Sequence, residues 1–114
     1  MTAGDIVIAR LPQANGELKN RPTVLLCELR PYGDFLLCGI SSKLHQEVPG
    51  FDHVIRATDN EFERSGLTTT SVIRLGFLST VTAPAVIGRI GSITPHLHGE
   101  LLGRLADFLR AQYK

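Results

Sequence analysis

The chain has 114 residues, of which 43% are hydrophobic, and its formal net charge is +1. This length suits one domain with a single core, and the small net charge excludes an overall attraction to nucleic acid. We therefore expect one soluble domain over residues 1–114, in which any contact with a polyanion depends on a local cluster of basic side chains. No apolar run reaches the roughly 18 residues of a membrane helix, and no signal pattern opens the chain, which predicts a cytoplasmic protein.

The beginning of the chain predicts two strands separated by a loop. Gly4–Leu11 is a β-branched run that begins at a Gly-Asp turn. The polar residues of Gln13–Asn20 predict an exposed loop, which leads to Arg21. Pro22 has no N–H to donate, so we expect it at the first position of a second strand, Pro22–Leu29.

A turn at Arg30–Asp34 predicts a hairpin between the second strand and a third, Phe35–Ile40. Polar groups stand at the ends of these two apolar runs. Arg21 lies at the entrance of the second strand, and Ser41 and Ser42 lie at the exit of the third. If the two strands pair, the guanidinium and the hydroxyls share one rim, which makes this rim the first candidate site.

The two cysteines, Cys27 and Cys38, lie inside these apolar runs and lack the spacing of a zinc or redox motif. We therefore expect buried, reduced thiols and neither a metal site nor a cofactor.

The second half of the chain predicts shorter elements. After a polar loop at His45–Gly50, the alternating or β-branched runs predict three more strands, Asp52–Ala57, Ser71–Leu78 and Val86–Gly91. Between the first two of these strands, Thr58–Gly66 opens with capping residues and predicts one short helical turn. Several short strands with close turn signals favour a compact barrel or sandwich.

The end of the chain changes from strand to helix periodicity. Thr94 is a suitable N-cap, and Pro95 suits the first helical position. One apolar stripe follows at helical spacing, formed by Leu97, Leu101, Leu102, Leu105, Phe108 and Leu109. The predicted fold class is therefore mainly β with a C-terminal amphipathic helix.

In this order, the elements carry motifs that resemble the MazF/PemK family of toxins from bacterial toxin–antitoxin systems. The motifs are Gly4-Asp5-Ile6-Val7, Arg21-Pro22-Thr23-Val24-Leu25-Leu26, Gly39-Ile40-Ser41-Ser42, Gly66-Leu67, Ser71-Val72-Ile73-Arg74-Leu75 and Ile87-Gly88-Arg89-Ile90-Gly91-Ser92-Ile93. The resemblance implies an SH3-like β-barrel of short antiparallel strands that forms a homodimer. It also implies a metal-independent, sequence-selective endoribonuclease that cleaves single-stranded RNA and is held in check by a cognate antitoxin protein.

The resemblance also gives the candidate residues their roles. Arg21 offers a fork of N–H donors to a phosphate, and Ser41 aligns with the hydroxyl residue, commonly threonine, that the family uses beside its arginine. These two are the catalytic candidates. The candidate RNA-binding residues are Lys19, Ser42, Lys43 and Arg74, and the candidate general bases are Glu17 and His45. A structural reading stays open for each, because serines often end strands and arginines often project into solvent.

The chain departs from the family pattern after Leu75. Many members carry an acidic residue there, often followed by glutamine, with an arginine three positions after the acid. This chain has Gly76-Phe77-Leu78-Ser79 instead. The departure leaves two alternatives to a ribonuclease. One is a non-catalytic toxin of the same barrel class that binds a protein target such as DNA gyrase, in the manner of the CcdB toxins, and the other is a degenerate member that binds antitoxin without cleaving RNA.

Overall fold

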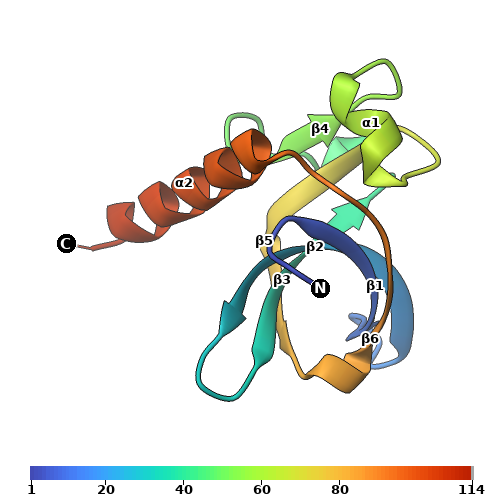
Figure 1. Cartoon of the computed structure of the whole chain (residues 1–114). Helices are drawn as coiled ribbons and strands as arrows, with labels where there is room; N and C mark the ends of the chain where they lie inside the picture. Colours follow the sequence, from blue (N-terminus) through green and yellow to red (C-terminus); the bar gives the residue numbers. More distant parts are fainter. Residues whose placement is uncertain (114) are drawn as a thin grey trace.

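The computed structural model describes residues 1–113 and shows six strands in one antiparallel sheet, in the order β4-β5-β3-β2-β1-β6. The sheet curls into a partial barrel, and helix α2 starts beside it and extends outward (Figure 1). The bounds are β1 Asp5–Pro12, β2 Leu18–Leu29, β3 Asp34–Ser41, η1 Leu44–Gln46, β4 His53–Ile55, α1 Asn60–Ser65, β5 Ser71–Val81, η2 Ala83–Ala85, β6 Val86–Ser92 and α2 Pro95–Ala111. The expected small β-barrel with a C-terminal helix is therefore confirmed.

Apolar side chains cover both faces of the sheet. One buried cluster lies between the sheet and α2 and is formed by Ile6, Val24, Leu26, Cys38, Ile40, Ile55, Ile73, Leu75, Ile93, Leu97, Leu101 and Leu105. The other lies on the opposite face, within the curl, and is formed by Val7, Ala9, Leu11, Leu25 and Leu37. Successive strand residues point to opposite faces, so a strand buried on both sides reads as a continuous apolar run. This explains why β2 and β3 show little alternation.

The second strand begins four residues earlier than expected. β2 starts at Leu18, so the loop that joins it to β1 is shorter than Gln13–Asn20, and Pro22 lies inside the strand opposite Ile8 of β1. The pairing of β2 with β3 begins only at Thr23. At Pro22 the strand therefore has a neighbour on one side only, where a missing N–H is tolerated.

The fifth strand is longer than expected and carries a bulge. β5 continues to Val81, past the predicted end at Leu78. Cys38 lies opposite Leu78, whereas the next residue of β3, Gly39, lies opposite Arg74. The three residues between these partners on β5, Leu75, Gly76 and Phe77, therefore have no partner on β3. Such a bulge bends a strand and redirects its side chains.

A buried carboxylate ties this bulge to the preceding loop. Asp52 is 5% exposed and accepts hydrogen bonds from the backbone N–H of Leu75, at 3.0 Å, and of Val48, at 2.9 Å. Asp52 lies outside β4, which has only three residues in place of the expected Asp52–Ala57. The side chain expected in a half-buried strand thus anchors the loop to the bulge of β5.

Helix α1 lies against the backbone of β6. The helix ends at Gly66, as expected, in the left-handed conformation with φ +73°. A Cβ on Gly66 would lie 2.0 Å from the carbonyl oxygen of Ile90, and a Cβ on Gly91 would lie 2.3 Å from the carbonyl carbon of Ser65. Glycine at both positions therefore allows the close approach of α1 to the backbone of β6.

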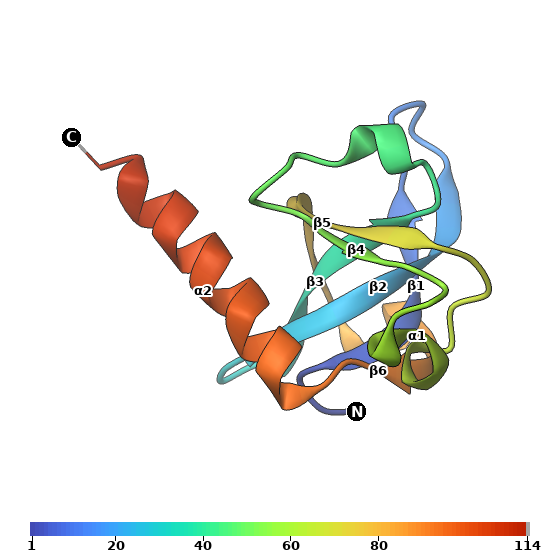
Figure 2. The same cartoon turned by 90° about the horizontal axis from the view of Figure 1, so that it is seen from above.

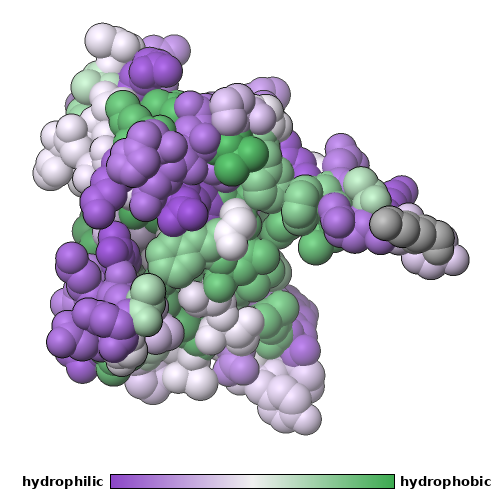
Figure 3. All heavy atoms as spheres, turned by 180° about the vertical axis from the view of Figure 1, so that it is seen from behind, coloured by the Kyte–Doolittle hydropathy of each residue, from purple (hydrophilic) through white to green (hydrophobic). Residues whose placement is uncertain are grey.

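Helix α2 begins as the sequence predicts, with the Thr94 hydroxyl accepting a hydrogen bond from the N–H of Leu97. Its second half projects away from the barrel (Figures 1 and 2). Consequently, only the first part of the apolar stripe is buried, while Leu102, Phe108 and Leu109 are exposed. Figure 3 shows apolar surface gathered where the helix leaves the barrel. None of the helices in residues 1–113 is long and apolar enough to span a membrane.

One histidine and the two cysteines have environments that the sequence did not fully predict. His98, in the first turn of α2, turns toward the sheet: its Nε2 lies 2.8 Å from the carbonyl oxygen of Leu26, which sits at an irregularity in the pairing of β2 with β3. Both cysteines are free, and burial raises the pKa of the Cys38 thiol to about 12. Cys27 is only partly buried, contrary to expectation.

Candidate functional site

Arg21 and Ser41 lie at the same end of two paired strands. Thr23 of β2 is opposite Gly39 of β3, and each candidate lies two residues beyond that pair, toward the same edge. Both side chains line two adjoining cavities, each of about 230 Å³. The pairing of the two strands therefore brings the guanidinium and the hydroxyl to one place.

The first cavity, which we call the basic cavity, holds three cationic side chains. Its lining residues are Gln13, Ala14, Arg21, Ile40, Ser41, Lys43, Gln46, Arg74 and Phe77. The cations come from three different segments, namely β2, the loop after β3, and β5. No acidic side chain lines the cavity among the residues that the structure describes. The cavity therefore favours an anionic group.

The Arg21 guanidinium is held in a fixed direction. Its Nε and Nη2 donate to the Oε1 of Gln13 at 3.1 and 2.6 Å. The amide of Gln13 is itself oriented, because its Nε2 donates to the carbonyl oxygen of Leu11 at 3.2 Å. A guanidinium has five N–H donors, so the two that Gln13 engages leave the rest for a ligand. A pre-oriented guanidinium loses less entropy when it binds a phosphate.

The second cavity, which we call the hydroxyl cavity, is lined mainly by hydroxyl side chains. Its residues are Arg21, Pro22, Ile40, Ser41, Ser42, Leu67, Thr68, Thr69 and Ser71. Ser41 is 8% exposed, and its Oγ accepts a hydrogen bond from the N–H of Lys43 at 3.0 Å. Because that bond uses a lone pair of the oxygen, the hydroxyl hydrogen can still be donated to a ligand.

The other predicted site residues divide between the cavities and the surface. Lys43 and Arg74 line the basic cavity, and Ser42 lines the hydroxyl cavity. Lys19, an exposed residue of β2, lines neither.

The two candidate bases also lie outside both cavities. Glu17 is exposed beside the turn between β1 and β2, and His45 is exposed in η1. A second imidazole, that of His53, begins β4, where burial and the nearby cation of Arg104 lower its pKa. None of the three lines either cavity in the described part of the chain.

Sequence reasoning missed the groups that complete the site. Gln13 was placed in an exposed loop without a role, yet it orients Arg21 across the turn. Phe77 enters the basic cavity only because of the bulge in β5. The hydroxyls of Thr68 and Thr69 lie in the connection before β5, and a run of polar residues there was the only available signal.

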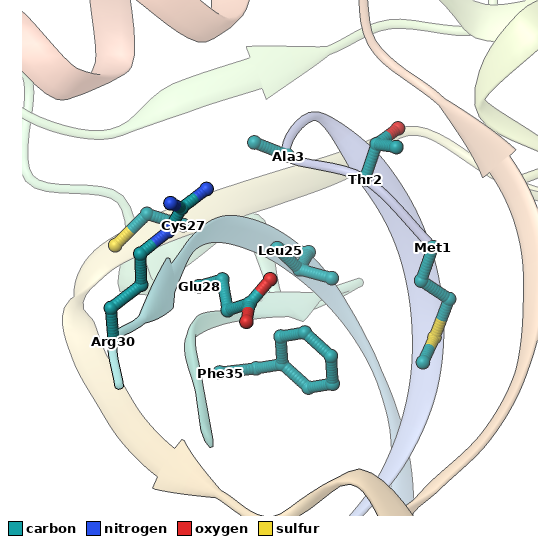
Figure 4. Close-up of a pocket in the computed structure, with 8 residues that line it drawn as sticks. All are labelled: Met1, Thr2, Ala3, Leu25, Cys27, Glu28, Arg30 and Phe35. Atoms are coloured by element: carbon teal, nitrogen blue, oxygen red, sulfur yellow. The ribbon is translucent and has the colours of Figure 1, made fainter. Parts of the chain in front are cut away.

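A larger cavity lies away from this site. It measures about 310 Å³ and is enclosed by the N-terminal residues and the β2–β3 hairpin (Figure 4). Its lining residues are Met1, Thr2, Ala3, Leu25, Cys27, Glu28, Arg30 and Phe35. It shares none of these with the two cavities around Arg21, and its acidic and basic groups are balanced.

Comparison with solved structures shows the fold. The Mycobacterium tuberculosis toxin MazF-mt6 matches with a TM-score of 0.63 and 18% identity, covering 90% of this chain and 93% of that one. An endoribonuclease in complex with its cognate antitoxin from a mycobacterial species gives 0.70 and 12% identity, with 100% and 99% covered. A MazE–MazF structure from Deinococcus radiodurans gives 0.66 and 16% identity, with 96% and 94% covered.

Sequence comparison separately identifies the family. A search of curated proteins gave no match. The family model described as "PemK-like, MazF-like toxin of type II toxin-antitoxin system" matches residues 2–109, which is nearly the whole chain. The protein therefore belongs to the PemK-like, MazF-like toxin family of type II toxin–antitoxin systems.

Proposed function

We propose that this toxin is an endoribonuclease that cleaves single-stranded RNA without a metal ion, with Arg21 and Ser41 at the scissile phosphate. The observation that carries the proposal is the position of these two side chains where the basic cavity adjoins the hydroxyl cavity. A phosphate bound between them would have one cavity for the nucleotide on either side. One structural neighbour is an endoribonuclease, which supports the same activity here.

The chemistry is the attack of a ribose 2′-oxygen on the adjacent phosphorus. The new O2′–P bond forms as the P–O5′ bond breaks. The 2′-hydroxyl loses its proton to solvent and the departing 5′-oxygen takes one up, which leaves a 2′,3′-cyclic phosphate and a 5′-hydroxyl. Arg21 stabilises the negative charge that grows on the phosphoryl oxygens, and Ser41 donates a hydrogen bond to the same group. Unpaired RNA is preferred because its backbone can bring the 2′-oxygen in line with the leaving oxygen, and its bases are free to bind.

Two protein partners belong to this proposal. The exposed apolar residues of α2, Leu102, Phe108 and Leu109, favour a homodimer in which this surface is covered. Two structural neighbours are complexes, one with a cognate antitoxin and one with MazE, which supports a cognate antitoxin for this chain. An acidic antitoxin segment would match the three cations of the basic cavity.

The purified protein is expected to cut an unstructured RNA in the presence of EDTA. The products should carry a 2′,3′-cyclic phosphate and a 5′-hydroxyl, which mass spectrometry distinguishes from a 3′-hydroxyl and a 5′-phosphate. The matched control is the same oligonucleotide with a 2′-deoxy residue at the cut position, which should stay intact. Inhibition of DNA gyrase without any RNA cleavage would instead support the non-catalytic alternative.

Replacing Ser41 by alanine should slow single-turnover cleavage about 10-fold, because one hydrogen bond to a charged group is lost. The Ser41→Thr variant keeps the hydroxyl and should retain most of the activity. The control is Ser79→Ala, which removes a hydroxyl from β5 outside both cavities. Equal rates for Ser41→Ala and the wild type would show that the hydroxyl has no part in the reaction.

A further inference from the structure

Phe77 is an aromatic side chain at the proposed catalytic site. It lines the basic cavity together with Arg21 and Ser41. The bulge of β5 places it there, since Phe77 is the last of the three residues without a partner on β3. The proposed chemistry assigns it no role.

The ring is held against the backbone of the neighbouring strand. A Cβ added to Gly39 would lie 2.5 Å from Cδ2 of Phe77, 3.0 Å from Cε2 and 3.1 Å from Cγ. Real Cβ atoms essentially never show a contact as short as 2.5 Å, so the ring occupies the space that a side chain at position 39 would need. Glycine at this position and the bulge of β5 therefore fix the ring together, and a fixed ring costs little entropy to use in binding.

A second flat group lies over the ring. The Cζ of Arg74 is 5.6 Å from the centroid of Phe77, within the range of a cation–π contact. Both side chains line the basic cavity. Proteins that bind unpaired nucleotides use these two kinds of planar group to stack bases.

We propose that Phe77 and Arg74 form a stacking surface for one unpaired nucleobase next to the scissile phosphate. The proposal rests on the proposed function and adds a base-binding residue to it. With the phosphate at Arg21, a neighbouring base can reach the ring within the same cavity. Every base has a flat face, so this contact would add affinity and fix the position of the cut without selecting the base by hydrogen bonds.

A packing role for Phe77 has to be separated from stacking. The ring also packs against the apolar cluster inside the curl, as Phe35 does. Phe35 lines the distant cavity of Figure 4 and neither cavity of the site. Phe35→Leu is therefore the matched control for Phe77→Leu, because both remove a ring from the same cluster.

The test measures binding of an oligonucleotide made uncleavable by one 2′-deoxy residue. Its sequence is that of an RNA which the wild type cuts, and a series carries an abasic residue at each position in turn. Fluorescence anisotropy should show one position where the abasic residue weakens wild-type binding about 5- to 150-fold, the range expected from loss of one stacked base.

The variants then assign that loss to Phe77. Phe77→Leu should weaken binding of the intact oligonucleotide to a similar extent and should show no further loss at the abasic position. Phe77→Tyr keeps an aromatic ring, so it should bind the intact oligonucleotide as tightly as the wild type and should again lose affinity at the abasic position. Phe35→Leu should bind like the wild type. Circular dichroism checks that each variant is folded.

Two results would overturn the stacking proposal while the ribonuclease assignment stands. Phe77→Leu could bind every oligonucleotide as tightly as the wild type does. Alternatively, it could still lose as much affinity at the abasic position as the wild type loses. A wild-type protein that neither binds nor cuts RNA would instead refute the proposed function, and the stacking proposal with it.

Discussion

Replacing Arg21 by alanine is expected to lower the single-turnover rate of RNA cleavage by roughly 10²- to 10³-fold, the typical effect of removing one donor that stabilises a developing oxyanion. The guanidinium is the only lining group in the described residues that both cavities share and that carries a charge. Gln13 orients it before substrate binds. The loss should therefore fall mainly on the chemical step, measured with saturating protein and labelled RNA.

Two further variants distinguish geometry from charge. Arg21→Lys keeps the positive charge but loses the planar fork, so it should recover only part of the activity. Arg64→Ala removes an exposed arginine from α1, outside both cavities, and should cleave like the wild type. A wild-type rate in Arg21→Ala would refute the catalytic role of Arg21, although the protein would still be a ribonuclease.

The sequence predicted those helix ends at which a capping residue, a proline or a glycine stands. The Thr94 cap with Pro95 predicted the start of α2, and Gly66 predicted the end of α1. The start of β2 was missed because Leu18 stands among polar residues and because Pro22 resembles the first residue of a strand. A proline inside a strand is acceptable only where its missing N–H has no partner to lose, and here the pairing of β2 with β3 begins only at Thr23.

The central pair of the site was predictable because strand pairing relates the two residues. Arg21 and Ser41 stand at the ends of two apolar runs joined by a short turn, so a hairpin brings them together. Phe77 was not predictable in this way. A regular β5 would keep its alternation from Arg74 onward, and only the bulge turns the aromatic ring toward Gly39 and the cavity.

Asp52 accepts a hydrogen bond from the bulge, and replacing it is the second change for which we expect a large effect. The two oxygens of its carboxylate accept from the N–H of Leu75, within the bulge, and of Val48, in the loop after η1. In Asp52→Ala, both N–H groups lose their partner, and the Leu75 group is buried. We expect the free energy of unfolding to fall by about 2–4 kcal/mol, measured by urea denaturation, because each unsatisfied group costs roughly 1–3 kcal/mol.

Cleavage should fall further than stability alone explains, because the same carboxylate holds both sides of the basic cavity. On one side it fixes the loop that follows Lys43 and Gln46, and on the other the bulge that carries Phe77. Asp52→Asn keeps one acceptor but presents an amide N–H₂ to the second donor, so it should lie between alanine and the wild type. The control is Asp59→Asn, whose carboxylate accepts from the N–H of Arg56 at the surface. If Asp52→Ala cleaved RNA at the wild-type rate under conditions where it is fully folded, the cavity would not need this anchor, and the bulge of β5 would be held by its packing alone.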